Sequence, residues 1–132
     1  MLTVEQARAF YISEDAVHDF EHVQRVYHNA MKLGKAEGAD LEILQAAALL
    51  HDVRGAEPGG AGRAEHHVTS ALFAEEVLMG KGWPVERIRA VQHAIRAHRY
   101  RGKEDQPETI EAKVLFDSDK LDVIGAIGAA RA

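Results

Sequence analysis

Apolar residues recur along the chain at intervals of three and four, the spacing that places side chains on one face of an α-helix. A typical stripe consists of Val23, Val26, Ala30 and Leu33. No segment shows the strict alternation of apolar and polar residues that is typical of a half-buried strand. The pattern therefore predicts an all-α fold, a compact bundle of five or six helices.

Residues that commonly begin or end helices delimit these segments, such as Asp40 as an N-cap and Gly38 as a stop. The expected helices run from Val4 to Tyr11, from Asp19 to Glu37, from Leu41 to His51, from Arg63 to Met79, from Pro84 along a stripe that reaches His98, and from Pro107 to the end of the chain. A break near Asp117 is considered within the last of them. The 132 residues suffice for one hydrophobic core and not for two. We expect residues 1–132 to form a single domain.

The composition narrows the possible classes of protein. Sixteen basic and 21 acidic residues give a net charge of −5, which argues against a domain that coats a nucleic-acid polymer. No apolar run approaches the roughly 20 residues of a membrane span, and the N-terminus lacks the order of a signal peptide. The absence of cysteine removes disulfides and thiolate ligands. We expect a cytoplasmic protein without membrane or nucleic-acid-polymer partners.

The candidate chemistry begins at His51 and Asp52, which end an apolar helical run. Burying a carboxylate or an imidazole without a partner costs free energy, so the pair needs a reason to lie there. A divalent metal is one reason, because it binds imidazole nitrogen and carboxylate oxygen together. The alternative is a helix-terminal histidine beside a solvent-facing aspartate.

Two further polar residues are expected to face the core. His22 lies on the apolar side of its helix, and Asp119 has mostly apolar neighbours at three and four residues. Asp117 has two lysines among the same neighbours, so its charge can be neutralised without a metal. Asp119 is the better ligand candidate of the two acids. With His51 and Asp52, these residues make a plausible divalent metal site.

Other stretches keep two interpretations each. Periodicity does not choose between His66 and His67, whereas His98 continues an apolar stripe and His93 does not. The glycine-rich residues 54–62 are a lid over a site or a plain connector. The basic residues 96–103 are a phosphate-binding patch or a favourable charge at a helix C-terminus.

An isolated His, a His-Asp pair and a distant Asp, in this order, resemble the HD superfamily of metal-dependent phosphohydrolases. The matching segments are HDFEHVQRV at 18–26, AALLHD at 47–52 and DSDKLD at 117–122. The His-Asp pair alone is weak, but the ordered set is specific, and the resemblance extends from about His18 to the end of the chain. It implies an HD-domain-like bundle whose metal ligands are His22, His51, Asp52 and Asp119.

The superfamily's small-Asp-x-Leu pattern is matched by residues 118–121 and also selects Asp119, which leaves Asp117 as an outer-shell or second-metal candidate. A short bacterial subgroup of the superfamily shares His66 and His98, which there lie near the metal and contact phosphate, water or a second ion. Relatives usually continue beyond the end of this chain. Missing elements could remove part of the pocket or an oligomer contact, so a homo-oligomer is considered.

The resemblance implies a divalent-metal phosphohydrolase that acts on a small phosphorylated substrate, with nucleotides as the favoured class. His66, His98 and Lys120 are then the catalytic candidates, which stabilise charge on phosphoryl oxygens or protonate the leaving oxygen. Arg25 and Asp117 are expected in substrate binding or the outer shell, although Arg25 lies on a solvent-facing side of its helix. Nitrogen and oxygen ligands together favour Mn, Fe, Co, Ni or Zn over Mg.

Two alternatives to the enzyme belong to other classes. A binding module could hold a metal and a nucleotide as a sensor without turnover. A helical scaffold would instead need its inward histidines and acids to be paired without metal. The candidate acid groups beside a full ligand set favour the enzyme over both.

Overall fold

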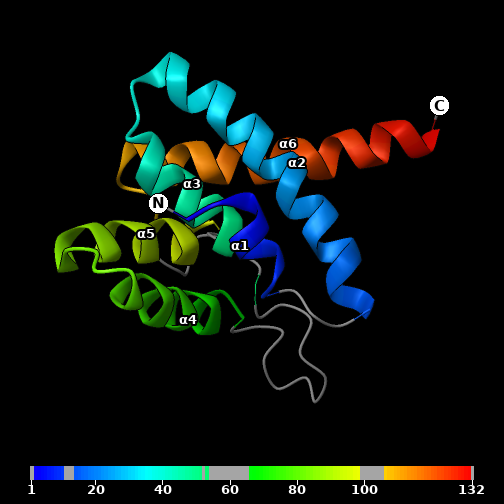
Figure 1. Ribbon diagram of the computed structural model, residues 1–132. Coiled ribbons are helices and arrows are strands. Elements are labelled where there is room, and N and C mark those ends of the chain that lie inside the picture. Colours follow the sequence, from blue (N-terminus) through cyan, green and yellow to red (C-terminus); the bar gives the residue numbers. More distant parts are fainter. Residues whose placement is uncertain (1, 11–13, 52, 54–65, 99–105, 132) are drawn as a thin grey trace.

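The protein is helical throughout the residues that the computed structural model describes, which are 2–10, 14–51, 53, 66–98 and 106–131 (Figure 1). The helices are α1 (Val4–Arg8), α2 (Glu14–Glu37), α3 (Leu41–Leu50), α4 (His66–Gly80), α5 (Val85–Ala97) and α6 (Ile110–Arg131). The prediction of an all-α fold is confirmed. None of these helices combines the length and hydropathy needed to cross a membrane.

Several predicted boundaries differ from the structure, most by one to three residues, and the last helix begins at Ile110 rather than Pro107. The first helix ends at Arg8, because the Phe10 N–H bonds to the Ala7 carbonyl in a tighter turn. The second begins at Glu14 rather than Asp19, and acidic residues in a first turn complement the helix dipole. The break considered near Asp117 is wrong: α6 continues through this residue, whose side chain is exposed and needs no interruption to reach solvent.

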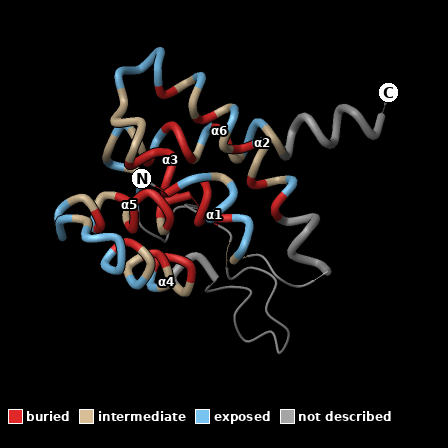
Figure 2. The backbone as a smooth tube through the Cα atoms, in the orientation of Figure 1, coloured by how far each residue is buried: buried red, intermediate tan, exposed pale blue. Residues whose placement is uncertain are grey.

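Helix α3 occupies the centre of the molecule and packs against each of the other five helices. All residues from Ile43 to Leu50 are buried, as the continuous red of α3 in Figure 2 shows. A helix that is apolar on all sides is stable only when other elements surround it. Helices α2 and α6 pack together on one side of α3, and the α4–α5 pair lies on the other (Figure 1).

The start of α3 is fixed by polar contacts to two neighbouring helices. The Asp40 carboxylate accepts from the backbone N–H groups of Glu42 and Ile43, at 3.1 and 3.3 Å, which confirms the predicted N-cap. Arg87 of α5 donates to Asp40 at 3.0 Å and to Glu42 at 2.9 Å. Glu111 of α6 accepts from the Asp40 N–H at 2.9 Å. These bonds anchor α3 at the end opposite to His51.

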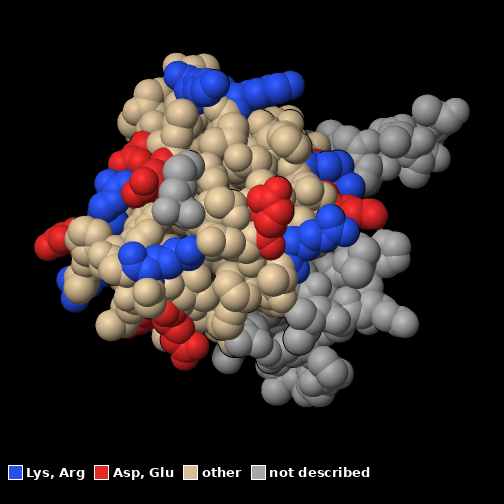
Figure 3. Space-filling model, viewed as in Figure 1, with Lys and Arg blue, Asp and Glu red and all other residues tan. Residues whose placement is uncertain are grey.

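The surface carries charges of both signs. On the face in Figure 3, lysine and arginine side chains are interspersed with aspartate and glutamate.

Helices α2 and α3 approach closely at Gly34, where an added Cβ would lie 2.5 Å from Leu44 Cδ2. Glycine at this position therefore permits the close contact of α2 with the buried helix.

We expect Gly34→Ala to destabilise the fold, because the added methyl group would overlap the fully buried Leu44 side chain. Overpacking of this kind costs about 1–3 kcal/mol of unfolding free energy. Urea unfolding would measure the loss, with Gly80→Ala as the control because no atom lies within 4 Å of a Cβ there. Equal stabilities of the two variants would contradict the close packing of α2 on α3.

The Asp40 cap predicts a second stability effect. Burial tends to raise the Asp40 pKa, but Arg87 and the backbone N–H donors outweigh it and hold the pKa below its usual range. The stabilisation is therefore present above the unfolded pKa of an aspartate and is lost as the pH falls through the folded pKa. Asp40→Ala should cost roughly 1 kcal/mol at neutral pH, as is typical for a lost cap.

Asp40→Asn keeps the cap acceptor and removes the charge, so urea unfolding of both variants separates the two contributions. We expect Asp40→Asn to retain most of the stability, because the ion pair with Arg87 is more than one third exposed. An asparagine variant as unstable as the alanine variant would show that the ion pair, rather than the cap, stabilises α3.

Candidate metal centre

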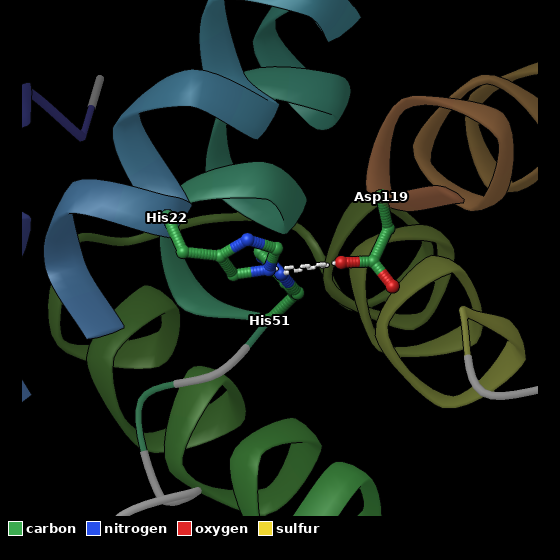
Figure 4. A group of neighbouring side chains, drawn as sticks. All are labelled: His22, His51 and Asp119. Atoms are coloured by element: carbon green, nitrogen blue, oxygen red, sulfur yellow. Dashed lines mark hydrogen bonds and ion pairs between the residues drawn. The ribbon is translucent and has the colours of Figure 1, made fainter. Parts of the chain in front are cut away.

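Three polar side chains from three helices meet at the end of α3 (Figure 4). His22 comes from α2, His51 is the C-cap of α3, and Asp119 comes from α6. Each offers one ligand atom, and these atoms all lie within 4.8 Å of one another. Asp119 Oδ1 is 2.9 Å from His22 Nε2 and 3.7 Å from His51 Nε2. Three of the four predicted ligands are thus brought together, and Asp52 lies outside the described residues.

His51 is oriented by a backbone group. Its Nδ1 donates to the Ala48 carbonyl at 2.7 Å, because a carbonyl oxygen can only accept. Its Nε2 is buried and has no hydrogen-bond partner among the described residues. An orphaned buried nitrogen costs free energy, and a divalent ion shared with Asp119 would remove this cost. The residues present therefore fit a divalent metal.

Asp119 is largely buried yet negatively charged at neutral pH. Burial would raise the pKa of its carboxyl group, but the hydrogen bond with His22 and the nearby imidazoles of His51 and His98 outweigh burial and hold the pKa far below its usual range. A carboxylate kept ionised inside the protein attracts a cation. Asp117 is exposed and is not part of the group, whereas Asp119 is one of its three members.

His22 has a carboxylate partner at each ring nitrogen. Nε2 faces Asp119 at 2.9 Å and Nδ1 faces Asp122 at 2.5 Å. Burial would lower the His22 pKa, but the two carboxylates outweigh it and raise the pKa to about 9. A proton and a metal ion compete for the lone pair of Nε2, so metal binding at neutral pH must displace a proton.

Asp122 was not among the predicted site residues. It also accepts from Arg25, whose Nε lies 2.7 Å from Oδ1 and whose Nη2 lies 3.3 Å from Oδ2. The sequence held one signal for Asp122, since it follows Asp119 by three residues and therefore shares its face of α6. Arg25 is 56% exposed, in agreement with its predicted solvent-facing side.

His98 lies beside this group at the C-cap of α5. Its side chain is buried, as the apolar stripe predicted, and its Nδ1 donates to the Ile95 carbonyl. The His98 and His51 rings meet edge to face, with centroids 4.9 Å apart. A further helix thus contributes an imidazole next to the candidate ligands.

The remaining predicted residues are placed elsewhere or are not described. The Lys120 ammonium group lies 4.7 Å from the centroid of the Phe116 ring, on the exposed side of α6. His66 begins α4, but its side chain is outside the described part of the chain, as are residues 54–62 and 99–103. The interpretations of those two stretches as a lid and as a phosphate patch stay predictions.

Comparison with known protein families and sequences shows several matches. The family model of the HD domain matches residues 19–124, a range that contains all three ligands of the group. The chain is 38% identical over 122 residues to the uncharacterized protein YpgQ of Bacillus subtilis, a match that covers 90% of this chain and 57% of YpgQ. It is 33% identical over 107 residues to ribonuclease Y of Chloroflexus aurantiacus, covering 79% of this chain and 17% of that enzyme. The chain therefore spans little more than half the length of YpgQ.

Solved structures show the same fold. A predicted HD superfamily hydrolase from an uncultured Thermotogales bacterium has a TM-score of 0.80 and 32% identity, covering 97% of this chain and 70% of that one. Bacillus subtilis YpgQ in complex with ADP has a TM-score of 0.69 and 33% identity, covering 98% and 64%. The expected HD-domain-like bundle is confirmed.

The two partners of His22 predict its titration in protein stripped of metal with a chelator. The imidazole should titrate near pH 9 rather than near its ordinary pKa of 6.5. Because the folded pKa is raised, the stabilisation by these contacts is complete below pH 6.5 and is lost as the pH rises through about 9. NMR of the histidine side chains would give the midpoint.

Asp119→Asn should move this midpoint down, because it removes one of the two carboxylates. His28, an exposed histidine of the same helix, provides the internal control in the same spectra. A His22 midpoint near 6.5 in the unmutated stripped protein would contradict the carboxylate contacts described above.

Proposed function

The chain belongs to the HD-domain family, and from this premise we propose that it is a divalent-metal-dependent phosphohydrolase that acts on a small phosphorylated compound, with nucleotides as the substrate class. The observation that carries the proposal is the buried, unpartnered Nε2 of His51, 3.7 Å from a carboxylate that is held ionised. In a helical scaffold without a metal, this buried nitrogen would remain unpaired at a cost in free energy.

Nucleotides are supported as the substrate class by a relative. YpgQ, whose fold this chain shares, was solved in complex with ADP. The match to ribonuclease Y involves 17% of that enzyme and supports the domain type rather than an RNA substrate. An overall negative charge also argues for a small substrate over a nucleic-acid polymer.

We assign the metal to His22 Nε2, His51 Nε2 and Asp119 Oδ1, with the carboxylate of Asp52 as a fourth ligand. Imidazole and carboxylate together favour Mn, Fe, Co, Ni or Zn over Mg, which prefers oxygen ligands alone. A divalent ion held there supplies Lewis-acid activation of water and of a phosphoryl oxygen. The chain's contribution is to hold the ligands in place and keep Asp119 ionised.

Hydrolysis adds water to phosphorus and breaks a phosphorus–oxygen bond, so the leaving oxygen needs a proton. We assign this transfer to Nε2 of His98, because Nδ1 of the same ring is held by the Ile95 carbonyl. Its ring already contacts the ligand His51 at a centroid distance of 4.9 Å. His66 is proposed as the second catalytic histidine, which stabilises charge on the non-bridging oxygens.

Lys120 is the proposed mobile cation of the site. Its contact with the Phe116 ring is exposed and is worth about 0.5–1 kcal/mol, which a phosphate would readily exceed. Arg25 and Asp117 are proposed for the outer shell. The alternative function is a sensor module that binds metal and nucleotide without turnover, and the experiment below separates the two.

The test measures metal content and phosphate release on the same samples of purified protein, with a panel of nucleotides. His22→Ala, His51→Ala, Asp52→Ala and Asp119→Ala should lower metal content and abolish release, because each removes a ligand. Asp117→Ala should affect metal content less. His98→Ala, His66→Ala and Lys120→Ala should retain the metal and slow turnover, by the 10²–10³-fold that is roughly typical of a lost stabilising donor.

His28→Ala is the matched control, since it removes an exposed histidine from the same helix as His22. Metal-loaded protein that binds nucleotides but releases no phosphate would overturn the enzyme in favour of the sensor. Full metal content in Asp119→Ala, with loss of metal in Asp117→Ala, would reverse the choice between the two acids.

A further inference from the structure

His22 is held at both ring nitrogens by one face of α6. Asp119 and Asp122 are three residues apart, so they project from the same side of the helix. Asp119 Oδ1 lies 2.9 Å from His22 Nε2, and Asp122 Oδ2 lies 2.5 Å from His22 Nδ1. The metal assignment uses only Asp119, so the contact with Asp122 needs a separate explanation.

Asp122 is in turn fixed by α2. Arg25 follows His22 by three residues and reaches both carboxylate oxygens, with Nε at 2.7 Å and Nη2 at 3.3 Å. The Asp122 side chain is only 9% exposed, whereas that of Arg25 is 56% exposed. The guanidinium fork therefore holds the carboxylate in one orientation while its own other side remains in solvent.

This geometry determines which nitrogen of His22 keeps its hydrogen when a metal binds. Ionised carboxylates can only accept, so the charged ring donates from Nε2 to Asp119 and from Nδ1 to Asp122. A metal ion held by Nε2 and Asp119 displaces the Nε2 proton, while the hydrogen on Nδ1 stays bonded to Asp122. His51 reaches the same tautomer by another route, since its Nδ1 donates to the Ala48 carbonyl.

We propose that Arg25 and Asp122 form a positioning relay that fixes the tautomer and ring orientation of His22, so that Nε2 presents its lone pair to a divalent cation. Neither residue contacts the cation or the substrate in this assignment. The inference rests on the metal site proposed above and assigns to Arg25 a role in positioning rather than in substrate binding. Partners of this kind typically change metal affinity by about 10- to 100-fold.

Asp122→Asn is the most informative variant. Arg25 donates to both positions of the side chain, so its Nε, the closer donor, would hold the amide oxygen. The amide NH₂ would then face His22 Nδ1. Two donors cannot form a hydrogen bond with each other, so Nδ1 would lose its acceptor. The ring would shift to the tautomer with hydrogen on Nε2, which blocks the ligand lone pair. We therefore expect a loss of affinity despite the nearly unchanged shape.

The experiment titrates the chelator-stripped protein with Mn²⁺ and Zn²⁺ in a calorimeter. We expect Asp122→Asn to bind each metal about 10- to 100-fold more weakly. Arg25→Ala should weaken binding in the same direction, and Arg25→Lys should lie between, because it keeps the charge without the fork. Glu86→Gln, an exposed acid of α5, is the control for the change in net charge.

Nitrogen-15 NMR of the His22 ring gives a readout that a purely structural role would not move. At a pH above its midpoint, the neutral ring should carry its hydrogen on Nδ1 in the unmutated protein and on Nε2 in Asp122→Asn. Circular dichroism establishes that each variant is folded. Because Arg25 is half exposed, its variants remain informative even where Asp122→Asn is unstable.

Unchanged affinity in folded Asp122→Asn and Arg25→Ala, with loss of metal in His22→Ala, would overturn the relay and leave the metal site intact. A protein that binds no metal would overturn both. Metal binding weakened by Asp122→Asn, in a protein that hydrolyses no phosphorylated compound, would support the relay while refuting the proposed function.

Discussion

The burial of α3 is the constraint on which the rest of the structure depends. Its residues from Ile43 to Leu50 are all buried, because the other helices cover it. Three consecutive alanines and the close approach at Gly34 allow those helices to lie near its axis. A buried helix must also end inside the protein, and this one ends with the imidazole of His51.

Burying polar groups at this end creates a chain of opposite charges. Asp119 requires positive partners, His22 provides one, and Asp122 and Arg25 extend the pairing to solvent. In such a network the removal of one member leaves the others buried and uncompensated, so the effects of single substitutions do not add. The same desolvation that makes the cluster costly favours a positive charge beside its carboxylates.

The helices also determine how precisely the centre is held. The three candidate ligands lie on α2, at the C-cap of α3 and on α6, and these three helices pack against one another. Sites built on packed helices hold their side chains within narrow limits, which suits metal coordination. His98 lies at the end of α5, so side chains from α2, α3, α5 and α6 meet at one end of the bundle.

Local periodicity was sufficient for much of this protein. The spacing of apolar residues predicted the helical class and the inward faces of His22 and His98, and it favoured Asp119, which lies in the cluster, over the exposed Asp117, because each depends only on neighbours within one or two turns. The Asp40 cap is equally local. What periodicity cannot encode is which faces of two helices meet. His22 and Asp122 are 100 residues apart, and their pairing follows from the packing of α2 on α6. Arg25 looked like a surface residue for the same reason: its position on α2 is exposed, and only the adjacent helix supplies the carboxylate that it binds.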